Sequence, residues 1–201
     1  MKAFNRVLNI LFLAIIAAGL FVSVKMELVG RSLWFDEAAL AWSFTQRSLS
    51  NLTSEGLELV QAAPVGWLYL MKIFTLIFGN TDYTLRIPSI IFYAATLVLI
   101  WYILDRIFTS RYALAGAAFA ASLPIILQYS NVFKPYISDC FFVLLAVIIY
   151  HRYMSGRLPA YALGISFSIL LWFSNPICFV EGGLIGATGL YALYKKDLKK
   201  I

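Results

Sequence analysis

The chain has 201 residues, of which 62% are hydrophobic and only 13% charged, and its mean hydropathy is +0.83. This composition lies far outside the range of soluble domains and predicts an integral membrane protein. The two cysteines, Cys140 and Cys178, both lie within apolar runs, so their spacing indicates neither a disulfide framework nor a metal site.

The first element is the apolar run 7–24, which follows the basic residues Lys2 and Arg6. The run is long and no small-residue cleavage site follows it, so we interpret it as a retained transmembrane helix rather than a secretory signal. Five later runs are also long enough to cross a bilayer core of about 30 Å. These runs are 87–104, 112–130, 136–150, 158–174 and 176–194.

The apolar run 64–78 is the exception, because a helix of that length reaches only about 22 Å and Lys72 lies in its middle. Cytoplasmic loops carry an excess of Lys and Arg. If 64–78 does not cross, the inner side holds ten basic and two acidic residues, and the outer side six basic and eight acidic. We therefore predict six crossings with both ends in the cytoplasm, which explains the net charge of +6 without a nucleic-acid partner.

This topology places residues 25–86 together on the outer side. Within them, SLWFDEAALAWSF (32–44) sets Asp36 and Glu37 among aromatic residues, and its apolar spacing predicts a helix lying flat at the interface. The two acids would begin that helix, where a negative charge is favourable in any case. The alternative is catalytic, because a partly desolvated carboxylate at a lipid surface can take a proton from an acceptor.

The outer turn YSNVFKPYISDCFF (129–142) adds further candidates. Lys134 precedes Pro135, which can open a helix, and a lysine beside a helix N-terminus can bind phosphate. Tyr136 and Asp139 follow in the first turn or so. Lys134 could instead be an interfacial anchor, whereas a carboxylate within a span, such as Asp139, more often has a function.

Three other charged residues have open roles. Arg86 stands at the mouth of the next crossing and is either a third charged point of an outer site or an interfacial anchor. Glu181, inside the sixth helix, either faces the same cavity or bonds to a neighbouring helix, and we slightly favour the structural role. His151, among Tyr150, Arg152 and Tyr153, is interpreted as an interfacial side chain at the inner end.

In combination, the aromatic-flanked Asp-Glu, APVGWLYLMKIF leading to FGNTDYTLRIPS, and YSNVFKPYISD resemble the N-terminal half of the GT-C glycosyltransferases. The subgroup is the protein mannosyltransferase and aminoarabinose transferase type (glycosyltransferase family 39-like). The resemblance implies an all-α polytopic membrane module over 1–201, with about six transmembrane helices and interfacial helices in a catalytic outer loop at about 25–86. It implies Asp36, Glu37 and Asp139 as catalytic residues, and it matches Arg86 to the arginine that follows the family's interfacial helix. From their place at a helix start, we expect Lys134 and Tyr136 to bind the donor phosphate together with Arg86.

The implied donor is a polyprenyl-phosphate sugar, and the implied acceptor is a lipid, glycan or protein at the outer face of the plasma (inner) membrane. Ala62 and Ala63 precede Pro64 where aminoarabinose transferases have Glu-Lys. No cofactor is therefore assigned, and a divalent cation is left open. Family members are more than twice this long, so we expect a C-terminal half or partner subunit in addition to this chain.

Two other functions compete with this interpretation. A transporter or lipid flippase predicts broken helices or inverted repeats with charges at the midplane. A non-catalytic GT-C-like partner subunit would keep only the helical shell. The distinguishing observation is whether Asp36, Arg86, Lys134 and Asp139 converge on one outward cavity.

Overall fold

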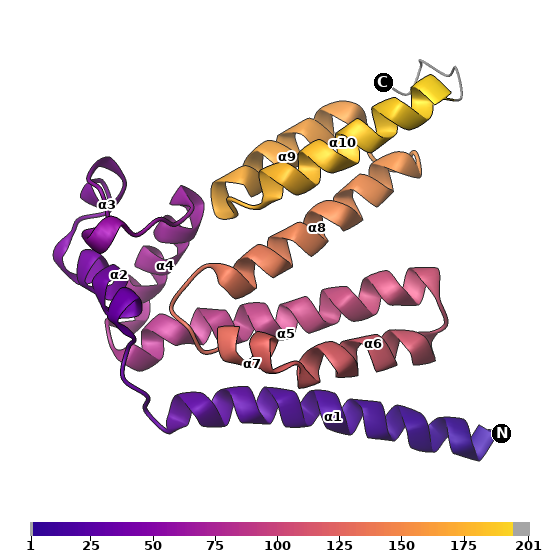
Figure 1. Ribbon diagram of the computed structural model, residues 1–201, viewed down its shortest axis with the longest axis horizontal. Coiled ribbons are helices and arrows are strands. Elements are labelled where there is room, and N and C mark those ends of the chain that lie inside the picture. The colour runs from indigo at the N-terminus through magenta and orange to yellow at the C-terminus, as the bar shows by residue number, and fades with distance from the viewer. Residues whose placement is uncertain (1, 195–201) are drawn as a thin grey trace.

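The computed structural model describes residues 2–194, and every regular element among them is helical. Figure 1 shows long helices running side by side, with the shorter helices that follow α1 gathered at one end of the bundle. The elements are α1 (Lys2–Leu28), α2 (Phe35–Gln46), α3 (Asn51–Ser54), η1 (Glu58–Val60), α4 (Val65–Phe78), α5 (Asp82–Ile107), α6 (Ser110–Ser122), α7 (Pro124–Tyr129), α8 (Tyr136–Met154), α9 (Ala160–Phe173) and α10 (Ile177–Tyr194).

The described chain is thus an all-α polytopic membrane protein, as its composition predicts. Four of its helices are long and apolar enough to cross a membrane: Phe4–Leu28 within α1, and the whole of α5, α8 and α10. In Figure 1 the chain passes back and forth between two ends, so that α1 starts and α10 finishes at the end opposite α2 and α4. We call the end that carries α2 the aromatic end and the other the basic end.

Two of the six expected crossings differ from continuous membrane-length helices. The expected run 112–130 is divided between α6 and α7, because Pro124 cannot donate a backbone hydrogen bond and Leu123 before it is extended. Helix α9 has 14 residues, which is only about 21 Å. The expectation of six crossings therefore remains a prediction, of which four helices satisfy the length requirement.

The α1 and α6 helices approach each other very closely. A Cβ atom on Gly19 would lie 2.7 Å from the Ala121 carbonyl oxygen and 2.8 Å from the Tyr93 hydroxyl. Tyr93 is fully buried and donates a hydrogen bond of 3.1 Å to the same carbonyl. A glycine at position 19 therefore permits α1, α5 and α6 to pack around one hydrogen bond.

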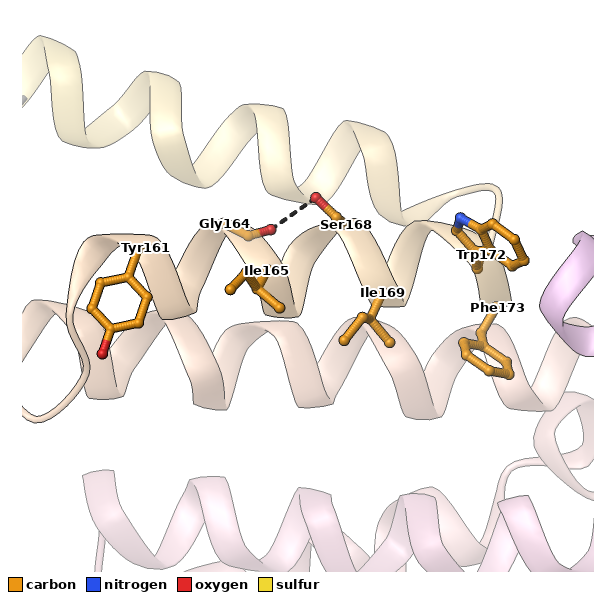
Figure 2. A pocket seen from close by; sticks show the side chains of 7 residues that line it. All are labelled: Tyr161, Gly164, Ile165, Ser168, Ile169, Trp172 and Phe173. Atoms are coloured by element: carbon orange, nitrogen blue, oxygen red, sulfur yellow. Dashed lines mark hydrogen bonds between the residues drawn. The ribbon is translucent and has the colours of Figure 1, made fainter.

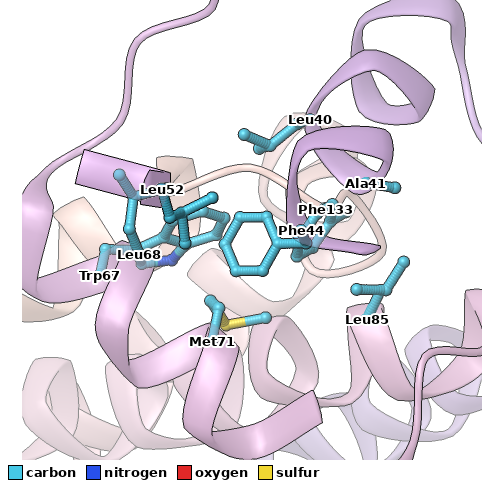
Figure 3. Close-up of a cluster of buried hydrophobic side chains, with 9 residues drawn as sticks. All are labelled: Leu40, Ala41, Phe44, Leu52, Trp67, Leu68, Met71, Leu85 and Phe133. Carbon is cyan, nitrogen blue, oxygen red and sulfur yellow. The ribbon is translucent and has the colours of Figure 1, made fainter. Parts of the chain in front are cut away.

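The aromatic end has a small hydrophobic core of its own, drawn in Figure 3. Phe44 of α2 lies edge-on to Phe133, with ring centroids 5.3 Å apart, and Trp67 of α4 lies 5.5 Å from Phe133. The other members come from α2, α3, α4 and α5. They are Leu40, Ala41, Leu52, Leu68, Met71 and Leu85.

This core explains why Lys72 is tolerated in the apolar run 64–78. Lys72 is buried, and its Nζ donates to the carbonyl oxygen of Phe44 near the end of α2. The positive charge thereby satisfies a carbonyl at a helix C-terminus, where cations are favourable. Helix α4 has 14 residues and packs with α3, α5 and α9, and the expectation that it does not cross the membrane remains a prediction.

Candidate functional site

The carboxylate of Asp36 and the amine of Lys134 meet at the aromatic end. Lys134 Nζ lies 3.3 Å from Asp36 Oδ2, and the Lys134 side chain is 5% exposed while that of Asp36 is 49% exposed. The Lys134 amine also donates to Gln61 Oε1. A half-exposed carboxylate thus faces a buried cation contributed by a segment almost one hundred residues further along the chain.

Glu37, the neighbouring acid, has an entirely different environment. Its side chain is 1% exposed, and Oε2 accepts from the Trp34 backbone N–H at 2.9 Å, the contact of a capping-box glutamate. Oε1 accepts from the Phe133 backbone N–H at 2.7 Å. Glu37 therefore ties the start of α2 to the loop that precedes Lys134.

Two arginines compensate the buried charge of Glu37. Arg31 Nη2 donates to Oε2 at 3.1 Å, and Arg86 Nε lies 3.6 Å from Oε1. The rest of the Arg86 guanidinium donates to the carbonyl oxygens of Arg31 at 2.7 Å and Ser32 at 3.2 Å. Arg86 is buried, so these contacts hold the chain between α1 and α2 in place.

The loop 130–135 is fixed by further polar contacts. Asn131 Nδ2 donates to the hydroxyls of Ser23 and Ser130, and Arg31 donates to the Asn131 carbonyl oxygen at 3.2 Å. Ser89 donates to the Val132 carbonyl oxygen at 2.8 Å. Helices α1 and α5 thereby position the backbone that carries Lys134.

Tyr136 and Asp139 lie in the first turn of α8, which begins directly after Pro135. Tyr136 is exposed and lies within electrostatic reach of both Asp36 and Asp139. Asp139 Oδ1 is buried without a hydrogen-bond partner in the described part of the chain, and so is the Ser174 hydroxyl after α9. The Ser174 hydroxyl nevertheless interacts with the Asp139 carboxyl group, so this acid has a polar neighbour.

The structure pairs Asp36 with Lys134, and it joins Glu37 and Arg86 in a buried network. Tyr136 and Asp139 follow Lys134 in the first turn of α8. Asp36, Arg86, Lys134 and Asp139 thus do not share one set of contacts. Arg86 also lines a hollow of about 330 Å³ on the far side of that network, together with Glu27 and Asp82.

Two candidates lie elsewhere. Glu181 is buried and lines a cavity of about 520 Å³ between α8, α9 and α10, and its Oε1 has no hydrogen-bond partner among the described residues. His151 is exposed near the last turn of α8, at the basic end.

Three polar residues of the site, Arg31, Gln61 and Asn131, were not predicted. Arg31 and Asn131 each lie within a few residues of a predicted site residue in the sequence, and this nearness could have suggested them as site residues. Gln61 contacts Lys134 from a distant loop, and no local pattern signals such a contact. Within residues 2–194, no three His, Cys, Asp or Glu side chains lie together so that they could hold a metal ion.

An apolar groove of about 580 Å³ follows one face of α9 (Figure 2). Tyr161 lies at one end of the groove, and Trp172 and Phe173 at the other. The Ser168 hydroxyl, which also lines the groove, donates to the Gly164 carbonyl oxygen at 2.9 Å, so its donor is satisfied within the helix. A groove of this kind suits contact with hydrocarbon chains.

These features define a polytopic membrane protein with a charged site at one end of its bundle. Residues 62–173, more than half of the chain, match the family of dolichyl-phosphate-mannose-protein mannosyltransferases. The chain belongs to this family of membrane glycosyltransferases. The matched range includes Arg86, Lys134, Tyr136 and Asp139, and leaves Asp36 and Glu37 outside it. No curated protein and no solved structure matches the chain.

Proposed function

We propose that the chain forms the reaction site of a membrane glycosyltransferase that moves a sugar from a polyprenyl-phosphate donor to a lipid, glycan or protein acceptor at the outer face. The observation that carries the proposal is the pair formed by Asp36 and Lys134, with 3.3 Å between Nζ and Oδ2. One member is a carboxylate accessible to an acceptor, and the other a cation suited to a phosphate.

The two charges divide the chemistry between them. The acceptor oxygen or nitrogen forms a bond to the anomeric carbon of the sugar while the bond from that carbon to the phosphate oxygen breaks. The electron pair of the broken bond stays on the lipid phosphate, whose negative charge Lys134 offsets. Asp36 takes the proton of the acceptor hydroxyl or amine, and a positioned base of this kind contributes about 10²–10⁴-fold to the rate.

In the absence of donor, Lys134 and Asp36 neutralise each other. A donor phosphate that contacts Lys134 competes with Asp36 for the cation and leaves the carboxylate free to accept a proton. Substrate binding thereby prepares the base. Glu37 and Arg86 act as positioning residues, because their polar atoms are directed at backbone groups and at each other.

Lateral access for a lipid donor is supported by the α9 groove. Its Trp172 and Phe173 end lies beside the start of α4, since a Cβ on Gly66 would lie 2.7 Å from the Trp172 carbonyl oxygen. A polyprenyl chain along α9 would bring its phosphate toward the aromatic end.

The proposal is tested by Asp36→Asn in membranes that contain the complete enzyme. Asparagine keeps the size and helix-starting ability of aspartate but not its basicity. We expect transfer to fall about 10²-fold or more and the donor lipid to accumulate. Donor binding should be at least as strong as in the wild type, because asparagine does not compete with the phosphate for Lys134. Asp82→Asn, at another helix start of the same end, is the matched control and should keep its rate. Transfer above about half the wild-type rate in Asp36→Asn would pass the role to Asp139 or indicate a non-catalytic subunit.

The competing transport function has two observations in its favour, the interruption at Pro124 and the buried Glu181. The charges that meet one another are nevertheless at the aromatic end rather than at the midplane. A flippase would move the donor lipid between leaflets without changing its mass. Donor-lipid profiling by mass spectrometry separates the two functions, because glycosyl transfer converts the donor into the free polyprenyl phosphate.

A further inference from the structure

A second charged feature lies at the basic end, far from Asp36. A pocket of about 210 Å³ opens between the last turns of α5 and α8. Its apolar wall is formed by Ile103, Val147 and Ile148, each about one turn further into its helix than the basic residues. Its polar rim is formed by Arg106, His151, Arg152 and Arg157.

The position of Arg157 is set by the backbone. Gly156 has φ of 69°, a conformation that glycine adopts without strain. The Gly156 N–H donates to the Tyr153 carbonyl oxygen and the Arg157 N–H to the Arg152 carbonyl oxygen, both at 2.9 Å. This is a Schellman motif, which ends α8 and turns the chain back so that Arg157 joins Arg152.

The rim carries positive charge that the described chain does not neutralise. Within residues 2–194, Arg106, Arg152 and Arg157 form no ion pair with any carboxylate. The guanidinium of Arg106 instead lies over the Tyr102 ring, 4.9 Å from its centroid, which orients it at the pocket. Three arginines gathered at one opening repel one another, and a bound anion relieves that repulsion.

We propose that this pocket binds the phosphate headgroup of an anionic membrane lipid in the leaflet at the basic end. The rim lies where two membrane-length helices end, which is the depth of headgroups. Arginine forks match phosphate oxygens in pairs, and the apolar wall below them fits the start of an acyl chain. A basic rim above an apolar wall favours a lipid over free phosphate, which has no chain to place there.

The test measures how much phosphatidylglycerol the purified full chain retains, with phosphatidylcholine as the zwitterionic comparison, by native mass spectrometry. Arg152→Gln/Arg157→Gln should lower the affinity for phosphatidylglycerol by about fivefold for each arginine removed and leave phosphatidylcholine unchanged. Arg6→Gln/Arg111→Gln is the matched control, since it removes the same charge outside the pocket. The single variant Arg157→Gln, beyond the end of α8, serves if the double variant does not fold.

Two results would overturn the proposal. Equal phosphatidylglycerol retention by the wild type and the pocket variants would mean that the arginines do not hold the headgroup, and an equal loss in the control would indicate general surface charge. Thermal unfolding distinguishes the source of the phosphate. We expect phosphatidylglycerol to raise the Tm of the wild type and inorganic phosphate to leave it unchanged, and full protection by inorganic phosphate would identify a free anion site instead.

Discussion

Adjacent acids at the start of α2 have opposite surroundings because a helix turns by about 100° per residue. Glu37 faces the interior and accepts hydrogen bonds from Trp34 and Phe133, while Asp36 faces the surface and meets Lys134. One carboxylate therefore maintains the architecture, and the other is available to a substrate.

Loss of the Glu37 charge should destabilise the protein. Glu37→Gln leaves the buried Arg86 without its counter-charge. It also places the NH₂ group of the glutamine side chain where neighbouring N–H groups need an acceptor. We therefore expect the free energy of unfolding to fall by about 3–5 kcal/mol. Thermal unfolding in detergent measures it. Glu55→Gln is the control, because its ion pair with Arg47 is exposed and contributes at most about 1 kcal/mol. A wild-type Tm for Glu37→Gln would show that the buried network is not what fixes the loop.

Lys134 is the residue on which donor binding should depend. Lys134→Ala removes the cation and should weaken binding of the donor lipid more than Lys134→Arg, which keeps the charge but changes its geometry. Binding of the polyprenyl-phosphate sugar to purified protein measures the effect. Lys25 is an exposed lysine in the last turn of α1, and the Lys25→Ala variant should bind the donor as the wild type does. Undiminished affinity in Lys134→Ala would reduce Lys134 to an interfacial anchor.

At the scale of elements, the connection between α7 and α8 is fixed by ring packing and by a backbone hydrogen bond. Phe133 is fully buried between Phe44 and Trp67, and its backbone N–H is bonded to Glu37. The next residue in the chain is Lys134. The aromatic core thus sets the position of the cation relative to α2.

Truncation of Phe133 should therefore affect both stability and reaction. Phe133→Ala removes a buried ring and should cost about 3–5 kcal/mol. It should also lower transfer at temperatures where the protein is still folded, because Lys134 loses its fixed position. Phe35→Ala removes an exposed ring of the same size and should change stability by no more than about 0.5 kcal/mol. If Phe133→Ala were destabilised but kept the full transfer rate, the aromatic core would not be what positions Lys134 for the reaction.

At the scale of the whole molecule, the distribution of basic residues between the two ends predicts the orientation of the site. The Lys and Arg residues of the α5–α6 and α8–α9 connections gather at the basic end. By the positive-inside rule we predict that this end lies in the cytoplasm and that the pair formed by Asp36 and Lys134 lies outside.

Cysteine labelling tests this orientation. Cys140 and Cys178 are exposed at the bundle surface, so both are first replaced by serine. A single cysteine at Ser110 or Ser155 should then be protected from an impermeant reagent applied outside, whereas one at Ser54 should react. All three positions are exposed, so burial does not explain a difference among them. Reaction at Ser110 in sealed cells would contradict the orientation.

Patterns within one segment were sufficient for several features of this protein. Apolar length predicts the spanning helices α1, α5, α8 and α10, and the aromatic and small-residue spacing after residue 34 predicts the helix that the structure has at Phe35–Gln46. The motifs quoted from residues 62–139 indicated the glycosyltransferase family that the family match shows. Helix length, apolar spacing and short motifs each depend on residues within one segment, so they can be predicted without knowing which segments come into contact.

The roles of individual charges depended on contacts between distant segments. Nothing in the sequence distinguishes Glu37 from Asp36, because the difference arises from Arg31, Arg86 and the backbone of Phe133. In the same way, only packing directs the Arg86 guanidinium to two backbone carbonyls. Which acid is buried and which cation is occupied are decided by tertiary structure, because burial and pairing belong to the three-dimensional neighbourhood of a residue and not to its neighbours in the chain.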